Sequence, residues 1–152
     1  MRGLLMAVAM ACAMPWAAHA QSSAPKIEIR DAWARLAAEG VNDTTAYAEI
    51  INLTSTTDRL LGASSPWADR VVFEKYEMVG YDMVAKAVPS IKIGKRDTVK
   101  LRPGEYHMKL LGLTQKLVPD QKIPITLRFQ NGGRVEMEAS ISNQKLGNMD
   151  AR

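Results

Sequence analysis

Short stretches in which apolar and polar residues alternate run through most of this 152-residue chain. A period of two places the apolar side chains on one face of a strand, whereas a helix repeats them every three or four residues. The stretches are residues 26–36, 45–53, 69–78, 90–93, 98–101, 101–113, 123–130 and 134–141. No segment keeps a helical period, so the pattern predicts one all-β domain, built as a sandwich or barrel.

Turn residues separate these stretches where strands should end. Asn131, Gly132 and Gly133 stand between two alternating stretches, and this composition is a strong hairpin signal. Pro103 and Gly104 form a similar break just before the strand that contains the only histidine beyond residue 20, His107.

The two ends of the chain differ from its middle. Arg2, an apolar run over residues 4–14 and the small residues Ala18 and Ala20 are typical of a signal peptide over residues 1–20, with cleavage expected after Ala20. Lipidation at Cys12 is a weaker alternative, because the residues before it fit that signal poorly. We therefore expect export to the periplasm, with no transmembrane segment in the mature chain. The remaining expected segments are a polar leader over 21–26, the β domain over 27–142 and a flexible tail over 143–152.

Removing the leader would leave no cysteine and one histidine. Disulfides, zinc clusters and thiol nucleophiles are thereby excluded, and a Ser-His-Asp triad would have to use His107, which has no serine elbow near it. Glu136 and Glu138 fit the exposed side of a half-buried strand better than a catalytic pair. We expect no enzyme activity.

Charge adds little to this picture. The formal charge of +4 falls by one when Arg2 is lost, an excess too small to indicate nucleic-acid binding. Basic residues are frequent between Lys86 and Arg102, but they alternate with apolar residues as a solvated strand face does.

Several stretches together resemble one family, the periplasmic PCu(A)C-type copper chaperones, also called DUF461. The similar stretches are DAWAR at 31–35, TAYAEIIN at 45–52, DRLLGASSPWADRV at 58–71, LRPGEYHMKLLGL at 101–113 and IPITLRF at 123–129. The resemblance implies a cupredoxin-like Greek-key β-sandwich or barrel in the periplasm. It also implies that the protein carries Cu(I), with cytochrome c oxidase subunit II or another copper-handling protein as its partner.

The resemblance also implies a ligand set of two histidines and two methionines. The soft thioether and imidazole groups suit Cu(I). The family's four ligand positions are occupied here by Glu74, Ala85, His107 and Lys109. Three of the four ligands are therefore missing, and the ammonium group of Lys109 would repel the ion.

Two other methionines are candidates to rebuild the site with His107. The family arrangement places position 74 opposite position 85 in a hairpin, which puts Met78 and Met83 on the same face as Glu74 but farther along the strands. In that register Tyr76 faces Met83 and Met78 faces Tyr81. Alternation places Met108 on the opposite face, in the core.

Two structural alternatives compete with a displaced copper site. Met78 and Met83 would instead pack with Tyr76 and Tyr81 as an apolar cluster, leaving His107 partly exposed and hydrogen-bonded. Glu74 and Lys109 stand where two ligands should converge, so they are also expected to form a replacement ion pair. Such a surface pair contributes only about 0 to 1 kcal/mol.

Two functions follow from these expectations. The first is a copper-chaperone-family protein whose Cu(I) binding is weak, altered or lost, with His107, Met83 and Met78 as candidate ligands. The alternative is a metal-free periplasmic module that keeps the fold to bind or assemble other proteins.

Overall fold

The computed structural model describes residues 26–142. The expected signal peptide, its cleavage after Ala20, residues 21–25 of the leader and the tail at 143–152 lie outside the described residues, so these expectations stay predictions. The described part contains strands and loops but no helix. Its strands are β1 (Ile27–Ala34), β2 (Thr44–Asn52), β3 (Asp58–Ser64), β4 (Ala68–Val79), β5 (Asp82–Val88), β6 (Ile91–Ile93), β7 (Thr98–Leu101), β8 (Tyr106–Leu113), β9 (Lys122–Phe129) and β10 (Arg134–Ile141).

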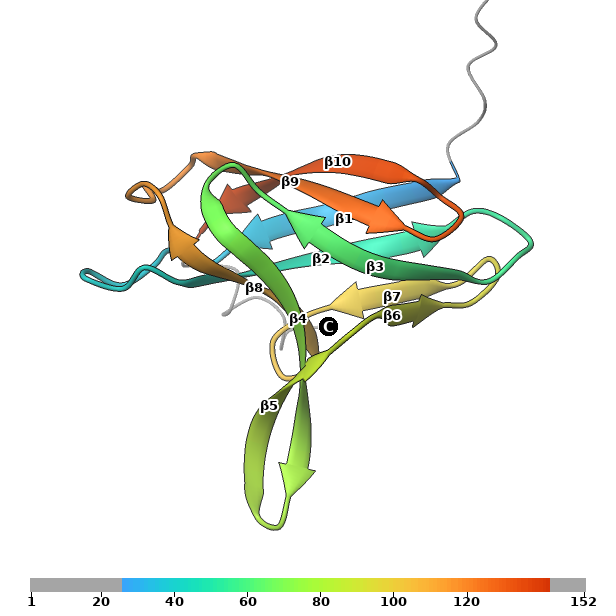
Figure 1. Cartoon of the computed structure of the whole chain (residues 1–152), viewed down its shortest axis with the longest axis horizontal. Coiled ribbons are helices and arrows are strands. Elements are labelled where there is room, and N and C mark those ends of the chain that lie inside the picture. The colour runs from blue at the N-terminus through green and yellow to red at the C-terminus, as the bar shows by residue number, and fades with distance from the viewer. Residues whose placement is uncertain (1–25, 143–152) are drawn as a thin grey trace, which may run out of the picture.

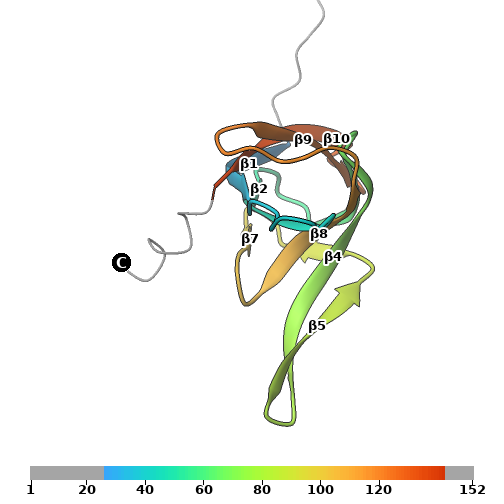
Figure 2. The ribbon, with the colours of Figure 1, turned by 90° about the vertical axis from the view of Figure 1, so that its left-hand side faces the viewer.

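Seven of these strands close into a barrel. Their order is β4, β8, β2, β1, β10, β9 and β3, and a β3–β4 pairing closes the ring. Figure 2 looks into this ring, with β9 and β10 on the side away from β5. The remaining strands extend it, since β5 pairs with β4, β6 with β3 and β7 with β2. The expected all-β fold is confirmed, and it is a closed barrel with extra strands.

The barrel is filled by the inward-facing residues of the alternating stretches. Ile50, Leu110 and Leu127 are completely buried, as is Met108, which confirms its expected place in the core. Burying one such side chain stabilises the fold by about 1.5–3 kcal/mol, so the alternation that predicts the strands also supplies the core. The Asn131–Gly133 turn joins β9 and β10 into the expected antiparallel hairpin.

One barrel strand is not evident from alternation. Strand β3 contains Leu60, Leu61, Gly62 and Ala63 in sequence, so its apolar positions do not alternate with polar ones. Leu60 is nevertheless fully buried, and the register with β9 shifts between Leu60 and Gly62. Such an irregularity resets which face the side chains occupy, and this explains why a simple period of two misses the strand.

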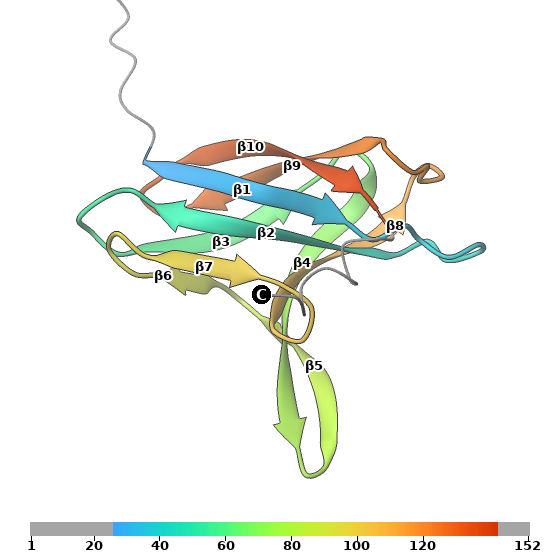
Figure 3. The same cartoon turned by 180° about the vertical axis from the view of Figure 1, so that it is seen from behind.

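Strands β4 and β5 form an arm that projects from the barrel. The first half of β4 pairs with β8 inside the wall, and its second half pairs with β5. Figures 1 and 3 show this hairpin leaving the barrel away from the other strands. Tyr81 at its turn is fully exposed, and Met78 and Met83 are 68% and 53% exposed.

Candidate metal centre

His107 lies on the outer face of the barrel wall but is buried there. Because Met108 points into the core, alternation turns the neighbouring His107 outward. It remains only 3% exposed, and the ring of Tyr76, at the base of the arm, stacks on the imidazole with centroids 5.0 Å apart. The expectation that His107 is partly exposed is therefore wrong, although it is hydrogen-bonded as expected.

Both ring nitrogens of His107 have partners. Nδ1 lies 3.2 Å from the carbonyl oxygen of Glu105, and Nε2 lies 3.2 Å from Oε2 of Glu74. A carbonyl oxygen only accepts hydrogen bonds, so Nδ1–H donates one to Glu105 and Nε2 faces the Glu74 carboxylate. A carboxylate also only accepts, so the Nε2–Glu74 hydrogen bond requires a proton on Nε2, and a metal at this nitrogen would have to displace that proton. The carboxylate of Glu74 contacts Nε2 and would therefore compete with a metal for it.

The strand register explains why Glu74 reaches His107. The two residues stand directly opposite each other on β4 and β8, whereas Lys109 stands opposite Val72. Among the described residues no ion pair joins Glu74 to Lys109, and the carboxylate contacts His107 instead. The expected Glu74–Lys109 pair is thus replaced by a Glu74–His107 pair two positions along β8.

The arm has a different register from the expected one. Glu74 stands opposite Ala87, Tyr76 opposite Ala85 and Met78 opposite Met83. The turn is therefore Gly80–Tyr81, with Gly80 at a φ of 66°. The expected register would place the β-branched Val79 at the first turn position, where two-residue hairpins require a positive φ and favour glycine.

A shallow cavity of about 270 Å³ opens beside His107. Met83 lines this cavity together with His107 and Tyr76, whereas Met78 does not. The structure therefore brings together two of the three candidate ligands. The expected packing of Met78 and Met83 with Tyr76 and Tyr81 into one cluster is not formed, since Tyr81 is fully exposed. The other lining residues are Arg35, Thr45, Tyr47, Pro103 and Gly104.

Arg35 and Tyr47 are cavity residues that the ligand pattern does not reveal. Nη2 of Arg35 lies 3.5 Å from the hydroxyl of Tyr47, whose ring packs against Trp33 with centroids 4.4 Å apart. Burial raises the pKa of Tyr47, and the charge of Arg35 partly offsets that rise. Both residues belong to the family-like stretches DAWAR and TAYAEIIN, which is the one signal that could have found them. The guanidinium makes the cavity less favourable for a cation.

The donors around the cavity are those of a soft-metal site with a competing carboxylate. Among residues 26–142 no group of three His, Cys, Asp or Glu side chains could hold a metal, which leaves imidazole and thioether as the relevant donors. Ala85 contributes no donor, and Lys109 lies on the same strand face as His107. Binding of Cu(I) would require Glu74, whose side chain is 18% exposed, to leave Nε2.

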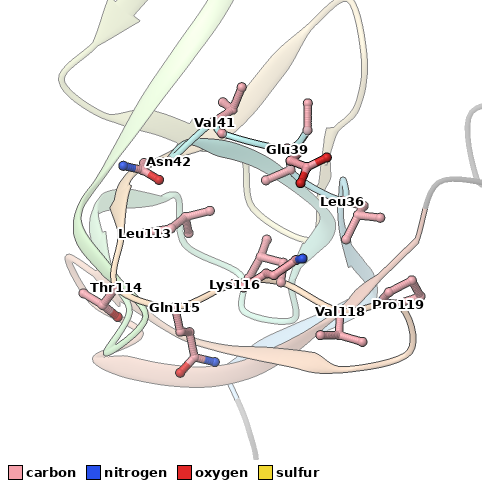
Figure 4. Close-up of a pocket in the computed structure, with 14 residues that line it drawn as sticks. Leu36, Glu39, Val41, Asn42, Leu113, Thr114, Gln115, Lys116, Val118 and Pro119 are labelled. Atoms are coloured by element: carbon pink, nitrogen blue, oxygen red, sulfur yellow. The ribbon is translucent and has the colours of Figure 1, made fainter.

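A larger cavity of about 760 Å³ lies at the other end of β8. It is bounded by the loop over residues 36–42 and the segment over 113–119, whose side chains Figure 4 shows around it. None of the candidate ligands lines it, so this cavity is separate from the candidate centre. In the described part of the chain, no helix is long and apolar enough to cross a membrane.

Comparison with known proteins places this barrel in a family. The family model described as putative lipoprotein LpqE-like matches residues 27–141. The putative lipoprotein Lxx21020 of Leifsonia xyli is 32% identical over 125 residues, covering 80% of this chain and 74% of its own length.

Solved structures agree on the fold. The copper-bound PCuAC domain from PmoF2 is 24% identical, with a TM-score of 0.66 over 77% of this chain and 92% of its own. The solution structure of CuI-DR1885 from Deinococcus radiodurans is also 24% identical, with a TM-score of 0.62 over 82% of this chain and 83% of its own. The chain thus has the fold of the PCuAC domains and belongs to the LpqE-like family.

Proposed function

We propose that this protein handles copper outside the cytoplasm and binds Cu(I) weakly through His107 and Met83. The observation that supports this most directly is the shared cavity, in which an imidazole and a thioether from two different strands face the same space. These donors suit Cu(I), and two solved PCuAC structures carry copper by their printed descriptions. Met78 stands opposite Met83 on the arm and is the outer thioether of the proposed site.

Weak binding follows from the neighbours of these donors. Glu74 competes for Nε2 of His107, Arg35 lines the cavity, and Lys109 stands on the same face of β8. A positive charge near a Cu(I) site raises the free energy of the loaded state. We therefore expect copper to be held more loosely than by a complete set of two histidines and two methionines.

An anaerobic Cu(I) titration against a competing chelator tests this proposal. His107→Ala should remove the measurable affinity, and Met83→Leu should weaken it by at least about tenfold. Met78→Leu should have a smaller effect, because that side chain does not line the cavity. Met137→Leu is the matched control, since Met137 is buried in β10 within the core. Unchanged affinity in the His107 variant would exclude this site.

The converse experiment adds ligands. Lys109→Met removes an ammonium and supplies a thioether on the face of His107, and Glu74→His frees Nε2 while adding an imidazole. Each variant should raise the Cu(I) affinity by at least about tenfold, equivalent to about 1.4 kcal/mol. Failure of both to raise it would show that the cavity does not hold copper.

The second candidate function is a metal-free binding or assembly module. Two observations favour it: Glu74 already satisfies Nε2 of His107, and the arm exposes several apolar side chains. A protein of this kind would show no Cu(I) affinity above that of the His107→Ala variant. The same titration therefore distinguishes the two functions.

The partner and the location are further parts of the proposal. We propose export to the periplasm, supported by the signal pattern of residues 1–20 and by relatives described as putative lipoproteins. The mass of the exported protein distinguishes cleavage after Ala20 from lipidation at Cys12. The proposed recipient is cytochrome c oxidase subunit II or another copper-handling protein. Loss of Cu(I) from the loaded protein on mixing with the apo recipient would test it.

A further inference from the structure

The outer edge of the arm is an unusual surface for an exported protein. Strand β5 pairs with β4 and with no other described strand, and six of its seven residues are exposed. Exposed edges normally carry a bulge, a proline or several charges that prevent pairing with another chain. The β4–β5 register runs without a shift from Phe73 to Val79, and β5 contains no proline.

The two-residue turn determines which backbone groups face the free edge. In such a hairpin the pair flanking the turn, Val79 and Asp82, is hydrogen-bonded, and hydrogen-bonded pairs then alternate along the strands. Asp82, Val84 and Lys86 therefore direct their backbone groups toward β4. Met83 and Ala85 direct theirs outward, where they are available to a further strand.

The side chains of β5 are complementary to a second copy of the same strand. In an antiparallel pair centred on Val84, Asp82 of each copy stands opposite Lys86 of the other, and Val84 stands opposite Val84. Met83 then stands opposite Ala85, so their outward backbone groups exchange hydrogen bonds across the symmetry axis. A register centred on Ala85 or Met83 places each charge opposite an apolar residue or glycine. The outward backbone groups can exchange hydrogen bonds in each of these three registers, and charge selects the one centred on Val84.

The fold leaves room for this pairing. The arm projects from the barrel in each view of the whole molecule, so two barrels related by a twofold axis at Val84 lie on opposite sides of the joined arms. Lys86 already contacts Glu77 of its own β4 at 3.2 Å, and both side chains are about half exposed. A second copy adds Asp82 to this ion pair and covers the exposed Val84.

We propose that this protein forms a symmetric dimer in which the β5 strands of two copies pair in the register centred on Val84. The two arms then form one four-stranded antiparallel sheet, and each face of an arm continues onto the other copy. The interface is isologous: each copy contributes the same strand, so the assembly is complete with two copies. The dimer requires no copper, so failure of the proposed metal site would not overturn it.

A charge-exchange experiment tests the register directly. Asp82→Lys places two lysines opposite each other at both ends of the paired strands, and Lys86→Asp does the same with aspartates. Each variant alone should raise the dimer dissociation constant at least about tenfold in sedimentation equilibrium. An equimolar mixture of the two variants should form heterodimers, because the two lysines of one β5 then face the two aspartates of the other.

The mixture also controls for damage to the fold, since misfolded variants would not restore association. Asp120→Lys, a charge change on the loop between β8 and β9, is the matched control and should leave dimerisation unchanged. A wild-type protein that stays monomeric up to about 1 mM would overturn the proposal. So would a dimer that both single variants leave intact, because its interface would lie elsewhere.

Discussion

At the residue scale, one carboxylate decides what His107 can do. Glu74 stands directly across from His107 and contacts its Nε2 atom, while the backbone of Glu105 holds Nδ1. A buried imidazole with one unpaired nitrogen would destabilise the folded state, so Glu74 stabilises the fold even though it competes with a metal for His107. Lys109, two positions along, has no such role toward His107.

This difference gives a prediction about stability. Glu74→Ala should lower the free energy of unfolding by about 1 kcal/mol, because it leaves Nε2 of the buried His107 without its partner. Lys109→Met should change it by less than about 0.5 kcal/mol. Urea unfolding of both variants beside the wild type measures the two effects. Equal losses in the two variants would contradict the pairing of Glu74 with His107.

The sequence predicts which strand face His107 occupies, but it does not predict the cross-strand partner of His107. Alternation correctly separates His107 from Met108, because the strand period fixes the face of each residue. It cannot give the β4–β8 register, since Glu74 and His107 are 33 positions apart and long-range pairing depends on the whole barrel. A shift of two residues along β8 separates the expected partner Lys109 from the observed one.

At the element scale, the turn residues decide how the strands meet. Gly80 takes a positive φ that Val79 would adopt only with strain, so the arm folds about Gly80–Tyr81. This turn places Met78 opposite Met83, and Tyr76 opposite Ala85. Attention to glycine at the first turn position would have predicted this register, whereas the family spacing alone did not.

A second turn is held by a buried carboxylate at the start of β3. Asp58 accepts hydrogen bonds from the backbone N–H groups of Asn131 and Gly132 in the β9–β10 turn, at 2.9 and 2.7 Å. It also accepts one from Arg59 at 2.7 Å. The side chain is 4% exposed, so these three donors replace water for the carboxylate.

Asp58→Ala should therefore destabilise the protein by about 2–3 kcal/mol, because it removes a buried carboxylate that accepts from three backbone N–H groups, two of them in the β9–β10 turn. Asp97→Ala is the matched control, since the carboxylate of Asp97 accepts a hydrogen bond from the backbone of Thr98 at an exposed site. Thermal unfolding of the two variants gives the comparison. A loss in the Asp97 variant as large as that in the Asp58 variant would argue against a specific role for Asp58 in holding the β9–β10 turn.

At the scale of the whole molecule, the seam between β3 and β4 has the fewest residue pairs in the barrel wall, one against two between β1 and β10. The β4–β8 pairing joins seven residue pairs, whereas the β3–β4 pairing that closes the ring joins Ala63 with Val71 alone. A cavity of about 420 Å³ lies beside this seam, lined by parts of β3, β4 and β5. Sparse pairing next to a cavity makes local opening easier here than elsewhere in the wall. The alternating pattern predicts most of the strands, but it misses β3 and contains no information about where the ring closes.

A disulfide across the seam should therefore stabilise the whole barrel. Directly opposite residues on antiparallel strands have Cα atoms at about 4.5–5.5 Å, within the range a disulfide spans. Oxidised Ala63→Cys/Val71→Cys should gain about 2 kcal/mol in free energy of unfolding over its reduced form, and exchange of the backbone amide hydrogen at position 71 should slow. The reduced double variant is the control, because both forms share the same side-chain changes. If the cross-linked form exchanges its β3 and β4 amides as fast as the reduced form, the seam is not where the barrel opens.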